Sequence, residues 1–83
     1  MWEDGYFKID GIELKYHAKV YDEGSKFGIN GGRISKLMVN YCREGDDVWE
    51  LDDAIIFYDR GWLVKPTTKF GEKALKHLLK LYK

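Results

Sequence analysis

The chain has 83 residues, of which 45% are hydrophobic, 16% are aromatic and 34% are charged. This length and composition predict one folded domain over residues 1–83 and exclude a disordered chain. Fourteen Lys and Arg balance fourteen Asp and Glu, and this zero net charge is unlike the basic balance of most nucleic-acid-binding domains.

The sequence carries no sign of export or of membrane insertion. Cys42 is the single cysteine, so no internal disulfide can form, which is compatible with a reducing cytosol. Residues 1–4 lack the basic and apolar character of a signal peptide, and the apolar run of residues 54–58 is too short to cross a bilayer. We therefore expect a cytoplasmic protein that has no membrane partner.

The first predicted element is a β-hairpin. Apolar and polar residues alternate over residues 12–21, which is the period of a half-buried strand. Asp10-Gly11 precedes this strand and is typical of a two-residue type I′ turn. The turn predicts a register that pairs Lys8 with Glu13, Phe7 with Leu14, Asp4 with His17, Trp2 with Lys19, and Gly5 with Tyr16, whose ring can cover the bare glycine backbone.

The rest of the chain predicts a loop, three further strands and a helix. Four glycines mark residues 22–32 as a loop, and residues 33–42 alternate as a strand. Residues 48–51 and 54–58 form a fourth strand with a bulge at 52–53, and residues 62–64 form a short return strand. Between these strands, Gly61 is expected in the left-handed position of a three-residue turn.

Pro66 ends the last strand, and Thr67 or Thr68 can cap a C-terminal helix. The helix has one apolar stripe, formed by Phe70, Ala74, Leu75, Leu78, Leu79 and Tyr82. These elements predict an α+β fold. Its antiparallel sheet has about five strands, a β-hairpin followed by a β-meander, and the amphipathic helix packs on one face.

The charges are segregated along the chain. Residues 44–59 hold seven acids and no Lys or Arg, whereas residues 65–83 hold six lysines and one acid. An ordinary solvated turn is one interpretation of the acidic stretch, and weak binding of a divalent ion is another. A third is imitation of a phosphate backbone, which makes the following acids candidate partner-binding residues: Asp46, Asp47, Glu50, Asp52 and Asp53.

The sequence contains no pattern of a known catalytic or metal site. Cys42, His17 and His77 have no zinc-ligand spacing, and the acidic stretch does not match a calcium-binding loop. Neither Ser25 nor Ser35 lies in a nucleophile motif. We therefore expect a protein that is not an enzyme and that uses no cofactor and no metal.

Basic residues supply the remaining candidates. The glycine-rich stretch of residues 28–32 leads into a strand and lacks the Lys-Ser/Thr ending of a phosphate-binding loop, so a turn with positive φ explains it better. Arg33 follows this stretch and could hold a carboxylate or a phosphate, and both Arg33 and Arg60 are candidate partner-binding residues. The lysines of the helix that could contact phosphate are Lys69, Lys73, Lys76 and Lys80.

Three stretches together carry a resemblance. They are residues 18–25 (Ala-Lys-Val-Tyr-Asp-Glu-Gly-Ser), residues 27–37 (Phe-Gly-Ile-Asn-Gly-Gly-Arg-Ile-Ser-Lys-Leu) and residues 58–62 (Tyr-Asp-Arg-Gly-Trp). The chain resembles a family of small uncharacterised proteins that are encoded by phages, prophages and mobile elements of Gram-positive bacteria. The resemblance implies a gene product that acts inside a bacterial host cell, and it implies no particular activity.

These observations lead to three functional expectations. The first is a non-enzymatic protein-binding module that inhibits a bacterial defence or nucleic-acid-processing protein of the host. The second is a nucleic-acid-associated protein that uses the lysine face of its helix. The third is a structural protein that forms a homo-oligomer at a sheet edge.

Overall fold

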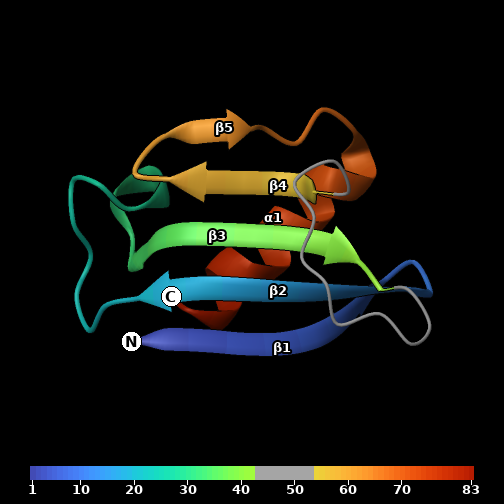
Figure 1. Cartoon of the computed structure of the whole chain (residues 1–83), viewed down its shortest axis with the longest axis horizontal. Coiled ribbons are helices and arrows are strands. Elements are labelled where there is room, and N and C mark those ends of the chain that lie inside the picture. The colour runs from blue at the N-terminus through green and yellow to red at the C-terminus, as the bar shows by residue number, and fades with distance from the viewer. Residues whose placement is uncertain (43–53) are drawn as a thin grey trace.

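The computed structural model describes residues 1–42 and 54–83. Its centre is a five-stranded antiparallel sheet in the order β1-β2-β3-β4-β5, and α1 crosses one face of this sheet (Figure 1). The elements are β1 (Trp2–Ile9), β2 (Ile12–Val20), a 3₁₀ turn η1 (Ile29–Gly31), β3 (Ile34–Tyr41), β4 (Ala54–Asp59), β5 (Trp62–Val64) and α1 (Lys69–Leu81). The predicted α+β fold is therefore confirmed. The predicted strand at 48–51 and the bulge at 52–53 lie outside the described residues.

The first hairpin has the predicted register. Asp10 and Gly11 have φ values of 52° and 82°, which are the two positive angles that a type I′ turn requires. Ile9 pairs with Ile12, and every following pair matches the prediction up to Trp2 with Lys19. A Cβ atom on Gly5 would lie 2.7 Å from Cε1 of Tyr16, so the tyrosine ring covers this glycine closely.

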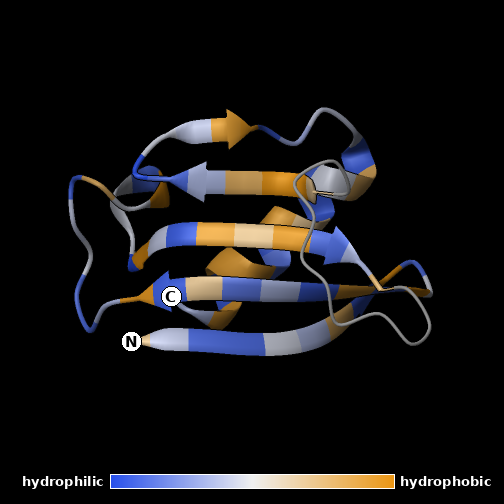
Figure 2. Ribbon diagram, viewed as in Figure 1, coloured by the Kyte–Doolittle hydropathy of each residue, from blue (hydrophilic) through white to orange (hydrophobic). Residues whose placement is uncertain are grey.

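The hydrophobic core lies between the sheet and α1. Its fully buried side chains come from alternate positions of three strands and from one stripe of the helix, and they include Leu14, Leu37, Val39, Ile56, Ala74 and Leu78. This alternation is visible along β2, which changes between hydrophobic and hydrophilic colours (Figure 2). At the edge of the core the phenol oxygens of Tyr16 and Tyr82 lie 2.7 Å apart. Burial and this hydrogen bond both raise the pKa of Tyr82.

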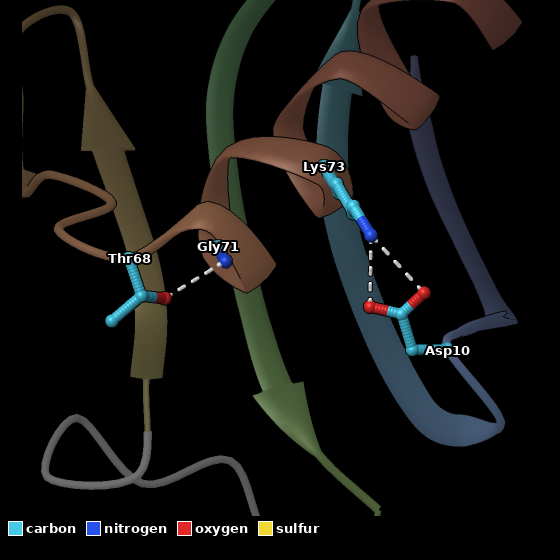
Figure 3. Close-up of polar contacts among 4 residues, drawn as sticks. All are labelled: Asp10, Thr68, Gly71 and Lys73. Carbon is cyan, nitrogen blue, oxygen red and sulfur yellow. Dashed lines mark hydrogen bonds and ion pairs between the residues drawn. The ribbon is translucent and has the colours of Figure 1, made fainter.

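Two polar contacts define the N-terminal end of α1 (Figure 3). The hydroxyl of Thr68 accepts a hydrogen bond from the Gly71 N–H at 3.0 Å, so Thr68 is the helix cap. Nζ of Lys73 lies 3.2 and 3.1 Å from the two carboxylate oxygens of Asp10, in the hairpin turn. Because both side chains of this ion pair are more than half exposed, it contributes at most about 1 kcal/mol to stability.

The glycine-rich loop combines positive φ with close backbone packing. Asn30 and Gly31 have φ values of 55° and 73°, so the prediction of a turn with positive φ is confirmed. A Cβ atom on Gly28 would lie 2.0 Å from the carbonyl oxygen of Gly32, a distance that no side chain can accept. The loop therefore needs glycine for space as well as for backbone conformation.

The prediction for the turn between β4 and β5 is wrong in one respect. Arg60 has a φ of 57°, and Gly61 lies outside the left-handed region. The Arg60 N–H donates to the Ser35 carbonyl at 3.0 Å, and the Asp59 N–H donates to the Gly61 carbonyl at 2.9 Å. The contact with β3 thus holds Arg60 in a conformation that the local sequence would assign to glycine.

α1 has 13 residues, and within residues 1–42 and 54–83 no helix has the length and apolar character needed to cross a membrane.

The different surroundings of Gly28 and Gly61 predict a large effect of substitution at the first and a small effect at the second. Gly28→Ala forces a methyl group against a backbone carbonyl and should lower the free energy of unfolding by about 1–3 kcal/mol. Gly61→Ala places its methyl group in open space and should change it by less than about 0.5 kcal/mol. Urea unfolding followed by tryptophan fluorescence measures both. Equal stabilities for the two variants would contradict the close approach of Gly28 to the Gly32 carbonyl oxygen.

Candidate functional site

A row of four side chains crosses the sheet on the face opposite α1. The strand registers place Trp2 of β1 opposite Lys19 of β2, Lys19 opposite Lys36 of β3, and Lys36 opposite Asp59 of β4. These positions alternate with buried core residues such as Ala18 and Leu37, so their side chains point away from the helix. We call this set, Trp2, Lys19, Lys36 and Asp59, the cross-strand row.

The indole ring of Trp2 lies close to both lysines of this row. Nζ of Lys19 and Nζ of Lys36 each lie 5.9 Å from the centroid of the Trp2 ring. The ring also stacks on His17 with a centroid distance of 4.4 Å and an interplanar angle of 11°, and His17 in turn pairs with Asp4 as the hairpin register predicted. Trp2 is nevertheless 49% exposed, so the ring remains available to a planar ligand.

The two lysines of the row form an unfavourable pair. Like charges directly opposite one another on neighbouring strands destabilise a sheet. The Asp59 carboxylate lies 3.7 Å from Nζ of Lys36 and offsets part of the repulsion, but both side chains are partly exposed and the ion pair is weak. The row keeps an excess positive charge beside an exposed aromatic ring, which is an arrangement that an anion would relieve.

A shallow hollow of about 380 Å³ continues the row. It is lined by Tyr21, Ser25, Phe27, Ser35, Lys36 and Arg60. Phe27 is 51% exposed, and Nζ of Lys26 lies 5.2 Å from the centroid of its ring. A hydrogen bond from Lys19 and the charge of Lys19 lower the pKa of the Tyr21 phenol, and Arg60 adds to this effect. The hollow is therefore electropositive.

The predicted contact Arg60 borders this hollow, whereas Arg33 lies elsewhere. Nε of Arg33 donates to the Tyr21 carbonyl at 2.7 Å, and Nη1 lies 3.4 Å from the Lys83 carbonyl. Arg33 lines a second hollow, of about 650 Å³, together with parts of the glycine-rich loop and the helix lysines Lys76 and Lys80. The structure thus brings together three candidates that are distant in sequence.

The second hollow suits an anion less well than the first. Asp22 and Glu23 also line it, and it lies at the C-terminal end of α1, where the helix dipole is negative. Arg33 already donates to backbone carbonyls. Of the other helix candidates, Lys73 pairs with Asp10, and Lys69 lies near the N-terminal end of the helix, outside this hollow. Lys69, Lys73 and Lys76 line a third hollow, of about 450 Å³, together with Glu72, so phosphate binding by the helix lysines stays a prediction.

Asp46, Asp47, Glu50, Asp52 and Asp53 all lie outside residues 1–42 and 54–83, so their role as a contact stays a prediction.

Two side chains that the sequence offered for metal binding or catalysis, Cys42 and His77, lie in the described part of the chain. Cys42 is half-buried, and burial raises the pKa of its thiol, which is therefore protonated and weakly nucleophilic at neutral pH. His77 stacks on Phe7 with a centroid distance of 5.0 Å. In the described part of the chain, no three His, Cys, Asp or Glu side chains gather into a group that could hold a metal ion.

Sequence reasoning missed the cross-strand row. The hairpin register already placed Trp2 opposite Lys19, but the pairing of Lys19 with Lys36 depends on how β2 meets β3 across the loop of residues 21–33. That loop has no turn signal that sets a register. The pair of lysines is therefore visible only in the folded sheet.

The fold defines a small α+β protein in which a five-stranded antiparallel meander is backed by one helix. The chain belongs to the family described as a domain of unknown function, DUF7678, whose model matches residues 1–83. This match confirms the expected kinship with a family of uncharacterised proteins. No curated protein and no solved structure matches the chain.

The environment of Tyr21 gives a direct test of the electropositive hollow. Lys19→Gln removes a hydrogen-bond donor and a positive charge that favour the phenolate, so the pKa of Tyr21 should rise toward its ordinary value of 10.0. A pH titration of the tyrosine ring carbons by NMR, with Tyr21→Phe for assignment, measures this shift. Lys26→Gln serves as the control and should leave the pKa unchanged. If Lys19→Gln left the pKa of Tyr21 unchanged, the described contact between Lys19 and Tyr21 would be contradicted.

Proposed function

We propose that this protein is a non-enzymatic binding protein that holds single-stranded nucleic acid on the sheet face opposite α1. The observation that carries the proposal is the cross-strand row, in which an exposed indole on the edge strand β1 lies 5.9 Å from Nζ of Lys19 on β2 and 5.9 Å from Nζ of Lys36 on β3. Proteins that bind single strands combine aromatic rings, on which bases stack, with cations that follow the phosphate backbone. Both components are present here on neighbouring strands.

The hollow beside the row extends the same chemistry. A base stacked on Trp2 would place its flanking phosphates near Lys19 and Lys36, and Arg60 would meet the next phosphate along the strand. Phe27 and Tyr21 offer further exposed rings at 51% and 44% accessibility. An open sheet that presents aromatic rings favours unpaired bases, because bases in a duplex are already stacked on one another.

The zero net charge does not argue against this proposal. Residues 43–53 hold six acids and one arginine, and the described remainder holds 13 Lys and Arg against 8 Asp and Glu. The sheet and helix therefore carry excess positive charge, and attraction of a polyanion depends on this local potential. The resemblance to proteins of phages and mobile elements supports the cytoplasm of a bacterial host cell as the place of action.

The lysine pair of the row should dominate the salt dependence of binding. For a labelled oligothymidine followed by fluorescence anisotropy, Lys19→Gln with Lys36→Gln should weaken binding at low salt. It should also reduce the slope of log affinity against log salt by about 1.4, or about 0.7 for each lost phosphate contact. Trp2→Ala should weaken binding by about 1–3 kcal/mol while leaving the slope unchanged, because a stacking ring carries no charge.

Lys69→Gln with Lys76→Gln is the matched control, since it removes the same charge from α1. If this control lost binding while the sheet variant retained it, the contact would lie on the helix. Absence of any anisotropy change for the natural chain at low salt and micromolar concentration would overturn the proposal.

We also propose a second candidate, a protein-binding module that inhibits a bacterial defence or nucleic-acid-processing protein. It is favoured by the run of seven acids without Lys or Arg in residues 44–59. In this view the acids imitate a phosphate backbone and occupy the basic groove of the partner. Asp59 also belongs to the cross-strand row, whereas the five candidate partner-binding acids of residues 46–53 do not.

Charge reversal tests this candidate. Lys in place of Asp46, Asp47, Asp52 and Asp53 should abolish stoichiometric retention of a host protein in a pull-down from nuclease-treated bacterial lysate, read by mass spectrometry. An unchanged circular dichroism spectrum should show that the fold survives the four substitutions. Retention of the same host protein by the charge-reversed variant would contradict the hypothesis that these acids imitate a phosphate backbone.

A further inference from the structure

The strand β1 forms one edge of the sheet, and the structure shows which of its backbone groups point outward. Met1 and Val20 exchange two backbone hydrogen bonds, at 2.8 and 3.1 Å. Hydrogen-bonded and non-bonded pairs alternate along an antiparallel ladder. The residues whose N–H and C=O groups point away from β2 are therefore Trp2, Asp4, Tyr6 and Lys8.

The two edges of the sheet differ in how well they are protected. β5 has three residues and is followed by Pro66, and short edges with a proline are a common defence against unwanted pairing. β1 has eight residues and contains no proline. Within the described part of the chain no other strand pairs with its outer side. The longer edge is thus the one that is open to another strand.

We propose that β1 pairs antiparallel with β1 of a second copy of this chain, so that the two sheets become one. The two-fold axis would pass through Tyr6, which would face Tyr6 of the second copy. Asp4 would then face Lys8 of the second copy, and Lys8 would face Asp4. All three pairs involve residues with outward backbone groups, so each pair exchanges two hydrogen bonds.

Charge complementarity selects this register. Side chains that face each other must lie on the same face of the joined sheet, which permits only shifts by an even number of residues. A shift of two residues in one direction moves the axis to Gly5, which places Asp4 opposite Tyr6 and leaves Lys8 without an acid. A shift of two in the other direction places Tyr6 opposite Lys8 and Asp4 opposite Asp10, and a shift of four places Asp4 opposite Asp4. Only the axis through Tyr6 pairs both charges of the edge with opposite charges.

The side chains required for this pairing are accessible. Asp4, Tyr6 and Lys8 are all exposed, and Tyr6 reaches 70%. Asp4 contacts His17 through Oδ1, while its side chain remains 68% exposed, so Oδ2 can meet a lysine. The axis is perpendicular to the joined sheet and leaves both helices on one face. Two cross-strand rows would then lie on the other face, although the pairing itself does not depend on nucleic-acid binding.

Proline at the centre of the edge provides the first test. The Tyr6 N–H points away from β2, so Tyr6→Pro removes no hydrogen bond of the β1–β2 ladder but blocks pairing at the axis. Sedimentation equilibrium of the full natural chain should show a monomer–dimer equilibrium, and Tyr6→Pro should be a monomer with an unchanged circular dichroism spectrum. Tyr6→Thr keeps the N–H and should still form the dimer.

Charge exchange provides the second test and keeps the proposal testable if the proline variant fails to fold. Asp4→Lys and Lys8→Asp each place like charges opposite one another and should raise the dimer dissociation constant at least tenfold. The double variant restores opposite charges in this register and should recover most of the loss. A natural chain that stays monomeric at the highest soluble concentration would overturn the proposal. So would a dimer that persists in Tyr6→Pro, or charge variants that the double exchange does not rescue.

Discussion

The register of the first hairpin is the constraint on which the two faces of the sheet depend. The Asp10-Gly11 turn sets Ile9 opposite Ile12, and from there alternate residues of β1 and β2 point to opposite faces. Leu14, Tyr16 and Ala18 are thereby directed under α1 and are buried. A slip of one residue would direct the polar neighbours of these residues into the core, at a cost that the small domain has little stability to offset.

The same alternation assembles the basic and aromatic face. Once the odd-numbered positions of the second strand point away from the helix, Lys19 lies beside Trp2 and meets Lys36 of the third strand. The pairing of two lysines is unfavourable for the sheet itself, which is why we assign it to binding rather than to stability. The apolar stripe of α1 packs in the core, so one face of the sheet serves folding and the other is the face of the proposed binding.

The net charge of zero conceals an uneven distribution of acidic and basic residues along this chain. Thirteen of its Lys and Arg residues belong to the described sheet, loops and helix, while six of its 14 acids lie between residues 43 and 53. Long-range attraction acts over a Debye length of about 8 Å at physiological salt, so a polyanion near the cross-strand row responds to local charge. The proposed pairing through β1 would place two such rows on one surface and raise the local positive potential further.

Local patterns of sequence by themselves determined much of the architecture. The Asp10-Gly11 turn, the alternation of residues 12–21 and the stripe of α1 follow from residues close in the chain, and each was predicted with its correct partners or position. The cap of α1 was predicted at Thr67 or Thr68, and the structure places it at Thr68. Only the tertiary structure decided the left-handed conformation of Arg60, the backbone contacts of Arg33 and the meeting of Lys19 with Lys36. These features depend on contacts between segments that are joined by loops without a turn signal. Their geometry is set by the packing of the whole sheet, which no short stretch of sequence specifies.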